Sequence, residues 1–234
     1  MSISKWMVIV FVVALCAVSA VAQEKAAPAA APATAPAAVA PAPAAAPAGG
    51  EAAAPAAAPA VKPGTKCQLP CKLYSNCEDE GEPAFIASGW MGSTDAIEYD
   101  DCWKENPHSG ASCIKVTFTD PKGWGGIVWQ SPANNWGDEE GGIDLTGAKQ
   151  LSFWARGDKG GEMAEFKMGV IGKNKPYWDT AKATLGQVKL GKDWKQYIIP
   201  LAGRDLSRVM SGFVFVVKGR PEPVVFYIDD IVYE

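Results

Sequence analysis

Histidine is nearly absent from the chain of 234 residues, which contains a single one, His108. Zinc sites are built from histidine and cysteine ligands, and the cysteine spacings of this sequence match no four-ligand pattern. A Ser-His-Asp hydrolase would have to use His108, which stands in a Pro-His-Ser-Gly turn. We therefore expect neither a zinc site nor a catalytic triad.

A cluster of basic residues is also missing. Lysine and arginine number 22 against 26 aspartates and glutamates, which leaves a net charge of −4 at pH 7. Proteins that bind DNA or RNA neutralise phosphates with a basic patch. The chain lacks that electrostatic footprint, and we expect no nucleic-acid partner.

Paired carboxylates in a spacing typical of glycosidases are lacking too. Glycoside hydrolysis uses two carboxylates about 5 to 10 Å apart. The nearest approach, IDDIVYE, has no leading glutamate, and the pair Glu98 and Asp100 runs directly into Cys102. Polysaccharide lyases use a tyrosine with a histidine or lysine, and the one histidine lies in a turn. The chain is therefore predicted not to be an enzyme.

The one long apolar run stands at the N-terminus and is too short to favour a permanent membrane span. Lys5 precedes an apolar core over residues 7–18, and residues 20–22 have the small-x-small pattern of a cleavage site. Leu15 disfavours lipid attachment at Cys16, although the sequence does not decide between cleavage and a lipid anchor. We predict a signal peptide over residues 1–22 and a secreted, periplasmic or cell-surface location, with no membrane span after signal cleavage.

Alanine and proline dominate residues 23–66. Such a segment has almost no apolar surface to bury, and its prolines favour extended geometry. We expect a disordered linker here, then a cysteine-containing lead-in over residues 67–77 and one folded domain over residues 78–234.

Five cysteines follow the predicted signal peptide, in keeping with an oxidising compartment. Cys102 and Cys113 flank a turn-rich decapeptide, so the sequence predicts a local disulfide between them. Among Cys67, Cys71 and Cys77, one pair can form and one thiol is left over. That thiol either bonds a partner chain or stays free, and the sequence does not decide which.

Short runs with alternating apolar and polar residues recur from residue 96 to the C-terminus, and no stretch has a clean helical period. Turn signals rich in glycine, proline and aspartate separate them. Many short strands at a spacing of about ten residues are typical of an all-β, antiparallel β-sandwich of the jelly-roll kind.

Two of these runs, QLSFWARG and AEFKMGVIG, are joined by a Gly-rich turn and are predicted to form a hairpin. Alternation places their apolar residues on one face. Trp154 and Arg156 should then share an exposed sheet face with Glu165 and Lys167. The alternative is that Trp154 covers a neighbouring strand or the stem of an arginine.

The runs SCIKVTFTDPKGWGGIVWQSPANNWG, DLTGAKQLSFWARG, DWKQYIIPL and FYIDDIVYE resemble the galactose-binding-like β-sandwich of non-catalytic carbohydrate-binding modules, near the family 11 type. The similarity covers residues 85–234. It implies two antiparallel sheets with a glycan cleft on one, and in many members a structural calcium ion. Carried over, an acid of YIDDI, Asp229 or Asp230, would be a calcium ligand; the alternative is that both end a strand in solvent.

Tryptophan, tyrosine and polar planar side chains are the residues that bind sugars, because the faces of sugar rings are apolar and hydroxyls need fixed partners. Trp129 and Trp194 are predicted to be core residues. The predicted ligand-binding residues are Trp124, Gln130, Trp136, Trp154, Arg156, Glu165, Lys167, Tyr177 and Trp178.

Together these observations predict a secreted, tethered, non-catalytic carbohydrate-binding module that recognises a poly- or oligosaccharide through one sheet face. The alternative is a structural or adhesive cell-envelope protein that uses the same sandwich for contacts with proteins. The Ala/Pro tether, the odd cysteine and the lack of an attached catalytic domain motivate this alternative, and a disulfide-linked partner through Cys67, Cys71 or Cys77 would favour it.

Overall fold

The computed structural model describes residues 64–78 and 82–234, so the predicted signal peptide and most of the predicted linker lie outside the described residues. The described part contains one 3-10 helix, η1 (Thr94–Ala96), and no helix long and apolar enough to cross a membrane. Its strands are β1 (Thr65–Lys66), β2 (Cys71–Tyr74), β3 (Ile86–Gly92), β4 (Ile97–Trp103), β5 (Cys113–Phe118), β6 (Trp124–Gln130), β7 (Ile143–Asp144), β8 (Gln150–Gly157), β9 (Met163–Met168), β10 (Ala183–Lys189), β11 (Lys195–Pro200), β12 (Ser211–Lys218) and β13 (Val224–Tyr233).

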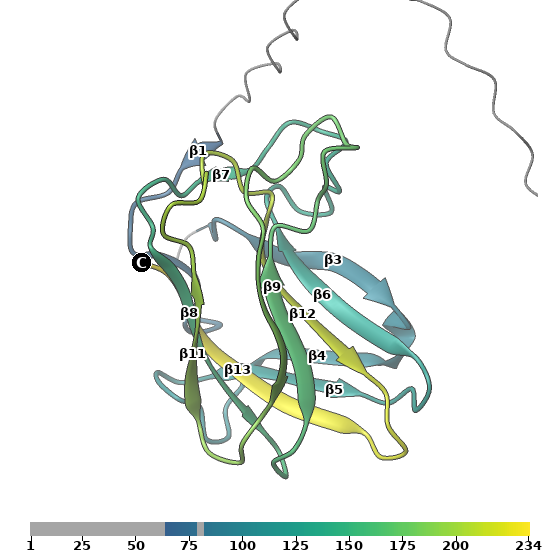
Figure 1. The fold of residues 1–234 in the computed structure, drawn as a ribbon. Helices are drawn as coiled ribbons and strands as arrows, with labels where there is room; N and C mark the ends of the chain where they lie inside the picture. The colour runs from purple at the N-terminus through teal and green to yellow at the C-terminus, as the bar shows by residue number, and fades with distance from the viewer. Residues whose placement is uncertain (1–63, 79–81) are drawn as a thin grey trace, which may run out of the picture. The chain divides into compact units, whose positions relative to one another are not determined.

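Two antiparallel sheets pack face to face (Figure 1). The five-stranded sheet has the order β10-β9-β12-β6-β3. The six-stranded sheet has the order β11-β8-β13-β5-β4, with β2 paired to β13. A short parallel pair joins Thr65 and Lys66 of β1 to β7, so the last residues of the predicted linker belong to the folded domain. The predicted antiparallel β-sandwich is confirmed.

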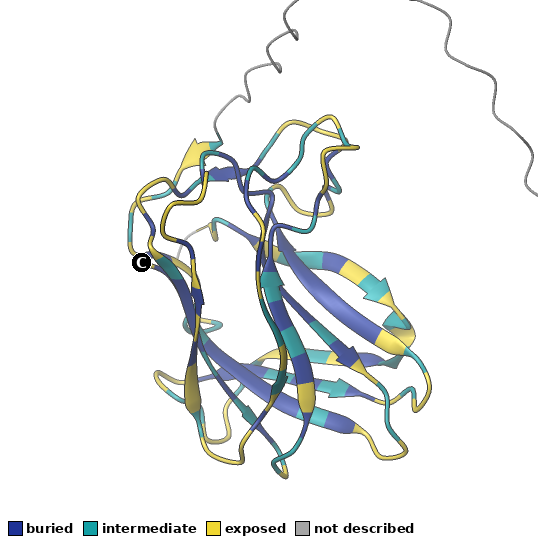
Figure 2. Cartoon of the chain, in the orientation of Figure 1, coloured by how far each residue is buried: buried dark blue, intermediate teal, exposed yellow. Residues whose placement is uncertain are grey.

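Aromatic side chains from both sheets fill the space between them. The ring centroid of Phe153 on β8 lies 4.7 Å from that of Phe166 on β9 and 5.1 Å from that of Phe213 on β12. All three side chains are fully buried, and Figure 2 shows the buried residues running along the strands of both sheets. Burying one such side chain stabilises the fold by about 1.5–3 kcal/mol. These contacts therefore hold the two sheets together.

The two tryptophans predicted for the core have different outcomes. Trp129 on β6 is 2% exposed and packs among the core phenylalanines, which confirms its prediction. Trp194 is only partly buried, and its indole N–H donates to the carbonyl of Asn106 at 3.1 Å, so its core prediction is wrong. The reason is the alternation of the strand. Trp194 lies on the same face as the exposed Gln196, whereas the buried Tyr197 lies on the opposite face.

Strands β8 and β9 do not form the predicted hairpin. Strand β8 pairs with β11 and β13, whereas β9 pairs with β10 and β12. The Gly-rich connection crosses from one sheet to the other because the apolar faces of the two strands pack against each other. Trp154 and Arg156 therefore lie on the outer face of the six-stranded sheet, and Glu165 and Lys167 on the outer face of the five-stranded sheet.

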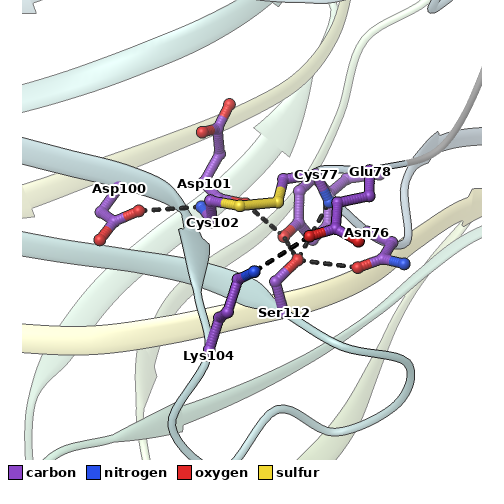
Figure 3. Close-up of a disulfide and its surroundings, with 9 residues drawn as sticks. Asn76, Cys77, Glu78, Asp100, Asp101, Cys102, Lys104 and Ser112 are labelled. Atoms are coloured by element: carbon purple, nitrogen blue, oxygen red, sulfur yellow. Dashed lines mark hydrogen bonds and ion pairs between the residues drawn. A yellow bond between two sulfur atoms is a disulfide. The ribbon is translucent and has the colours of Figure 1, made fainter.

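Cysteine pairing also differs from the prediction. Cys102 is bonded to Cys77, and Cys113 is free and buried, so the predicted Cys102–Cys113 disulfide is wrong (Figure 3). In the ladder between β4 and β5 the residue opposite Cys113 is Trp103. Cys102 comes one residue earlier, inside the register shift between Asp100 and Trp103, and its sulfur bonds that of Cys77 in the lead-in.

The lead-in is fixed to the domain by its cysteines. Cys67 is bonded to Cys71, and Cys77 to the end of β4, so the predicted left-over thiol among these three is wrong, as is the disulfide-linked partner through one of them. Next to the second disulfide, the Ser112 hydroxyl donates to the Asn76 amide oxygen at 2.9 Å and accepts the backbone N–H of Cys77 at 3.0 Å (Figure 3). The lead-in is therefore an integral part of the sandwich.

Candidate functional site

The outer face of the five-stranded sheet is defined by the pairing of its strands. Alternate residues of β9, β12, β6 and β3 form two rows across the sheet on the side away from the core. Read from β9 to β3, the rows are Lys167, Val214, Val128 and Gly89, and then Glu165, Val216, Gly126 and Met91.

One side of this face is polar and charged. The ammonium of Lys167 lies 3.1 Å from the carboxylate of Glu165, with side-chain exposures of 26% and 31%. On the neighbouring edge strand β10, Thr184 lies opposite Lys167 and Gln187 opposite Glu165, and both are exposed. The face therefore has accessible hydrogen-bonding groups along β9 and β10, beside an apolar strip on the central strands.

A loop after β6 lies against one end of the face. Gln130 is fully buried: its amide oxygen accepts the Ser88 hydroxyl at 3.0 Å and its amide nitrogen donates to the Asn135 carbonyl at 2.9 Å. A Cβ on Gly89 would lie 3.0 Å from the ring of Trp136. Both amide atoms of Gln130 are thus engaged inside the protein, and they position the loop that presents Trp136.

A second loop, between β9 and β10, lies beside the first. The backbone N–H of Tyr177 donates to the carbonyl of Gly137 at 3.0 Å, and Lys175 forms an ion pair with Asp138 at 2.8 Å. The predicted ligand residues Trp136 and Tyr177 therefore come from two hydrogen-bonded loops at one end of the five-stranded sheet, which Figure 1 shows above β6 and β9.

The second loop is anchored below these aromatic residues. The Arg208 guanidinium lies 4.9 Å from the ring centroid of Trp178 and donates to its carbonyl at 3.1 Å. The next residue, Asp179, is buried and accepts the N–H of Ile171 at 2.8 Å, the N–H of Ser211 at 3.0 Å and the hydroxyl of Ser211 at 2.5 Å. Burial raises the pKa of the Asp179 carboxyl. Trp178 and Asp179 thus fasten the loop to β12 and the segment before it.

Trp124 stands at the opposite end of the same face. It is the first residue of β6, lies opposite Lys218 and is 46% exposed. Gln130 lies six positions further along the strand, which corresponds to about 20 Å. Trp124 at one end and Trp136 with Tyr177 at the other therefore bracket the Glu165–Lys167 pair. Such a surface can stack sugar rings and hydrogen-bond their hydroxyls.

The remaining two predicted ligand residues lie on the other sheet. The ring of His108, from the loop between β4 and β5, stacks on Trp154 with centroids 3.7 Å apart and planes at 16°. The Arg156 guanidinium lies 3.8 Å from the ring centroid of Tyr227 and 5.3 Å from that of Trp194. Trp154 is thus covered by a loop of its own domain, an arrangement that neither interpretation of this residue had predicted.

Asp229 and Asp230 hold the same loop. One oxygen of Asp229 accepts the backbone N–H groups of His108 and Ser109 at 2.9 and 3.2 Å, and its other oxygen accepts the N–H of Asp230 at 2.8 Å. Asp230 accepts from the His108 ring at 2.7 Å and from the Ser109 hydroxyl at 2.8 Å. Burial raises the pKa of Asp229 to about 6.

These contacts do not fit the calcium site that the resemblance implies. A calcium ion takes six to eight oxygen ligands, whereas all four carboxylate oxygens of Asp229 and Asp230 here face N–H or O–H donors. In the described part of the chain, no group of three or more histidines, cysteines, aspartates or glutamates is arranged to hold a metal ion. Calcium binding stays a prediction, and the contacts of the two acids do not support it.

The apolar strip on the five-stranded sheet was missed at the sequence level. Val128 and Val214 are fully buried although they lie on the outer side of the sheet, because the neighbouring strands and loops surround them. The runs GIVWQ and GFVFVVK are continuously apolar, as in a strand that is buried on both sides, so the sequence does not show plainly which residues face outward. The available signal was the alternation of Val214 and Val216 with Phe213 and Phe215, which assigns the valines to the outer face.

No family model matches the chain, and no curated protein matches it. Among solved structures, a family 30 carbohydrate-binding module of the cellulosomal cellulase CEL9D-CEL44B of Clostridium thermocellum is 19% identical; the alignment covers 71% of this chain and 98% of that chain, with a TM-score of 0.45. A second structure of a family 30 module is 17% identical over 71% of this chain and 99% of the other, with a TM-score of 0.47.

A variant of the family 29 carbohydrate-binding module CBM29-2 is also similar. It is 11% identical over 70% of this chain and 89% of that chain, with a TM-score of 0.41. These neighbours are β-sandwich modules of families 30 and 29. The predicted likeness to the family 11 type stays a prediction.

Proposed function

We propose that this protein is a non-catalytic glycan-binding domain whose site is the outer face of the five-stranded sheet. The observation that carries the proposal is the placement of aromatic rings at both ends of one face, Trp124 and Trp136, with the partly exposed Glu165–Lys167 pair between them. Aromatic faces contact the apolar faces of sugar rings, and charged groups make strong hydrogen bonds to hydroxyls.

The dimensions of the face favour a chain of sugars over a single one. Trp124 and the loop of Trp136 are separated by the length of β6, about 20 Å. One ring cannot contact both ends, so the proposed ligand is an oligo- or polysaccharide that runs between the two ends of the face, past the partly exposed Val216, Glu165 and Lys167. Its hydroxyls would meet Lys167, Glu165 and the exposed Gln187 on the polar side of the face.

Export of the domain is part of the proposal. Two disulfides lie within the described residues, and disulfides persist in oxidising compartments. Together with the predicted signal peptide and Ala/Pro linker, they support a domain that is secreted or displayed at the cell surface and held at a distance from its N-terminus.

The test is a glycan-array screen of the full chain followed by titration of any bound oligosaccharide. Trp124→Ala and Trp136→Ala should each weaken binding about tenfold, because each removes one stacking contact of about 1.4 kcal/mol. Trp154→Ala is the matched control: the same substitution on the other sheet should leave the affinity unchanged.

Two outcomes would contradict the proposal. If Trp154→Ala abolished binding and the other two variants did not, the site would lie on the six-stranded sheet. If a demonstrably folded chain bound no glycan, the structural or adhesive role would be the better explanation of the sandwich. That alternative has lost its support from the odd cysteine, because Cys67, Cys71 and Cys77 are all bonded within the chain.

A further inference from the structure

The outer face of the six-stranded sheet carries a row of alternating cationic and aromatic side chains. Across the central strands, Lys115 of β5 lies opposite Tyr227 of β13, and Tyr227 opposite Arg156 of β8. Trp103 at the end of β4 and Trp194 before β11 flank this row at its two sides. We use the name cation–aromatic row for these five residues.

Contacts within the cation–aromatic row fix the positions of both cations. The ammonium of Lys115 lies 3.5 Å from the ring centroid of Trp103. The Arg156 guanidinium lies 3.8 Å from the centroid of Tyr227 and 5.3 Å from that of Trp194. Cation–π contacts of this kind are worth about 0.5–2 kcal/mol each. The guanidinium is therefore ordered before any ligand arrives, which lowers the entropic cost of binding.

Neither cation has an anionic partner. Within residues 64–78 and 82–234, Lys115 and Arg156 form no ion pair and no hydrogen bond to a carboxylate, in contrast to Lys167 on the other sheet. Two acids lie near the row without forming an ion pair with either cation. Asp100 lies opposite Lys115 in the ladder and accepts the N–H of Cys102 at 2.9 Å, and Asp158 accepts the hydroxyl of Tyr227 at 3.1 Å.

Two N–H donors of the row also lack a hydrogen-bond acceptor in the described structure. The Nε of Arg156 and the indole N–H of Trp103 are shielded from solvent and have no hydrogen-bond partner in the described structure. Unpaired donors in a native protein call for an explanation, such as a ligand or a bound solvent molecule. One of these donors belongs to a cation of the row, and the other to the ring that contacts Lys115.

We propose that the cation–aromatic row is a second binding site, which recognises the carboxylates of an acidic sugar chain such as a polyuronate. A guanidinium offers parallel N–H donors that match a carboxylate, and Lys115 offers a second positive charge. The two residues lie two strands apart, about 9–10 Å. One extended acidic chain can therefore contact both. The inference goes beyond the proposed function, because the sheet, the residues and the charge of the ligand all differ.

The experiment compares two forms of one sugar chain. The full chain is titrated with de-esterified oligogalacturonate and with the same oligomer fully methyl-esterified, with tryptophan fluorescence or calorimetry as the readout. The acidic form should bind about tenfold or more tightly than the ester, because only it offers charged acceptors for Arg156. Raising the salt concentration should weaken the acidic complex, since the cations lie at the surface.

Three variants locate the site. Arg156→Gln should weaken binding of the acidic oligomer about tenfold, and Arg156→Lys should recover part of that loss, because it keeps the charge and loses the planar fork. Lys115→Gln is a second, independent variant for the case in which Arg156 variants unfold. Lys149→Gln is the matched control: it removes one exposed cation that belongs to neither proposed site and should leave the affinity for the acidic oligomer unchanged.

The proposal is overturned if the de-esterified oligomer does not bind, if the ester binds equally well, or if Arg156→Gln and Lys115→Gln both leave the affinity unchanged. Equal or tighter binding of an oligo-aspartate peptide would assign the row to an acidic protein instead of a sugar. These outcomes are separate from those of the glycan-array test, which depends on Trp124 and Trp136.

Discussion

The two outer faces of the sandwich are built from the same strand alternation and yet present opposite chemistry. On the five-stranded sheet the cation Lys167 is paired with Glu165, and valines separate them from the aromatic residues. On the six-stranded sheet Lys115 and Arg156 lie directly on aromatic rings and have no carboxylate partner in the described structure. This difference underlies the two proposals, a neutral glycan on the first face and an acidic chain on the second.

Loops, more than strands, produce this difference. The loops after β6 and β9 lie at one end of the five-stranded sheet and leave Glu165 and Lys167 partly exposed. The loop between β4 and β5 instead folds over the six-stranded sheet, where His108 stacks on Trp154. Strand alternation thus decides which side chains face outward, and loop contacts decide which of them a ligand can reach.

Removal of Asp179 should have the largest effect on the five-stranded side. Asp179→Ala leaves the buried N–H groups of Ile171, Met210 and Ser211 without their acceptor, which should cost about 3 kcal/mol of unfolding free energy. Chemical denaturation measures this cost.

Asp205→Ala is the control for this change, because that exposed carboxylate accepts only the N–H of Ser207 and should lose less than about 1 kcal/mol. Asp179→Ala should also weaken neutral glycan binding and spare the cation–aromatic row. Equal losses at both faces would show that the faces are not independent.

Removal of His108 should have a smaller effect, confined to the other side. His108→Ala loses the ring stacked on Trp154 and the hydrogen bond to Asp230, together about 1–2 kcal/mol. Lys104→Ala in the same loop, where an exposed ion pair with Glu78 is lost, should cost less than about 1 kcal/mol. Thermal unfolding gives both values, and a His108 variant as stable as the parent would mean that the loop does not clamp the sheet.

How far the sequence predicts this molecule depends on the range of the contacts involved. Alternation of apolar and polar residues is local, so the strands, the sandwich and the core position of Trp129 follow from it. Which sheet a strand joins is a long-range property: β8 and β9 are adjacent in sequence, yet the contact of Phe153 with Phe166 places them in opposite sheets. The division of Trp154 and Lys167 between two faces was therefore not predictable.

Hydrogen-bond and disulfide partners that lie far apart in the chain could not be predicted from the sequence either. The oxygens of Asp229 and Asp230 accept N–H and O–H groups of a loop about 120 residues earlier in the chain, a set of contacts that no local pattern indicates. A disulfide between Cys102 and Cys113 was predicted from their separation in sequence, but Cys102 is bonded to Cys77, which lies 25 residues earlier. Proximity in sequence gave no information on either point.

Chelation of calcium should change nothing on either face. We expect this result because each of the four carboxylate oxygens of Asp229 and Asp230 already faces an N–H or O–H donor. Scanning calorimetry with EDTA and with millimolar calcium should give the same melting temperature within about 1 °C. A rise of several degrees with calcium would restore the calcium site and require the loop of His108 to move.

The smallest expected effect concerns the thiol of Cys113, which lies on the outer side of β5 in phase with Lys115 and is fully buried. Burial raises its pKa to about 12, so at pH 8 only about one molecule in ten thousand carries the reactive thiolate. Iodoacetamide should leave Cys113 unlabelled in the native chain and label it after denaturation. Non-reducing peptide mapping should then recover Cys77 linked to Cys102. Labelling without denaturant, or a peptide linking Cys102 to Cys113, would show that the loop between β4 and β5 does not cover this sheet.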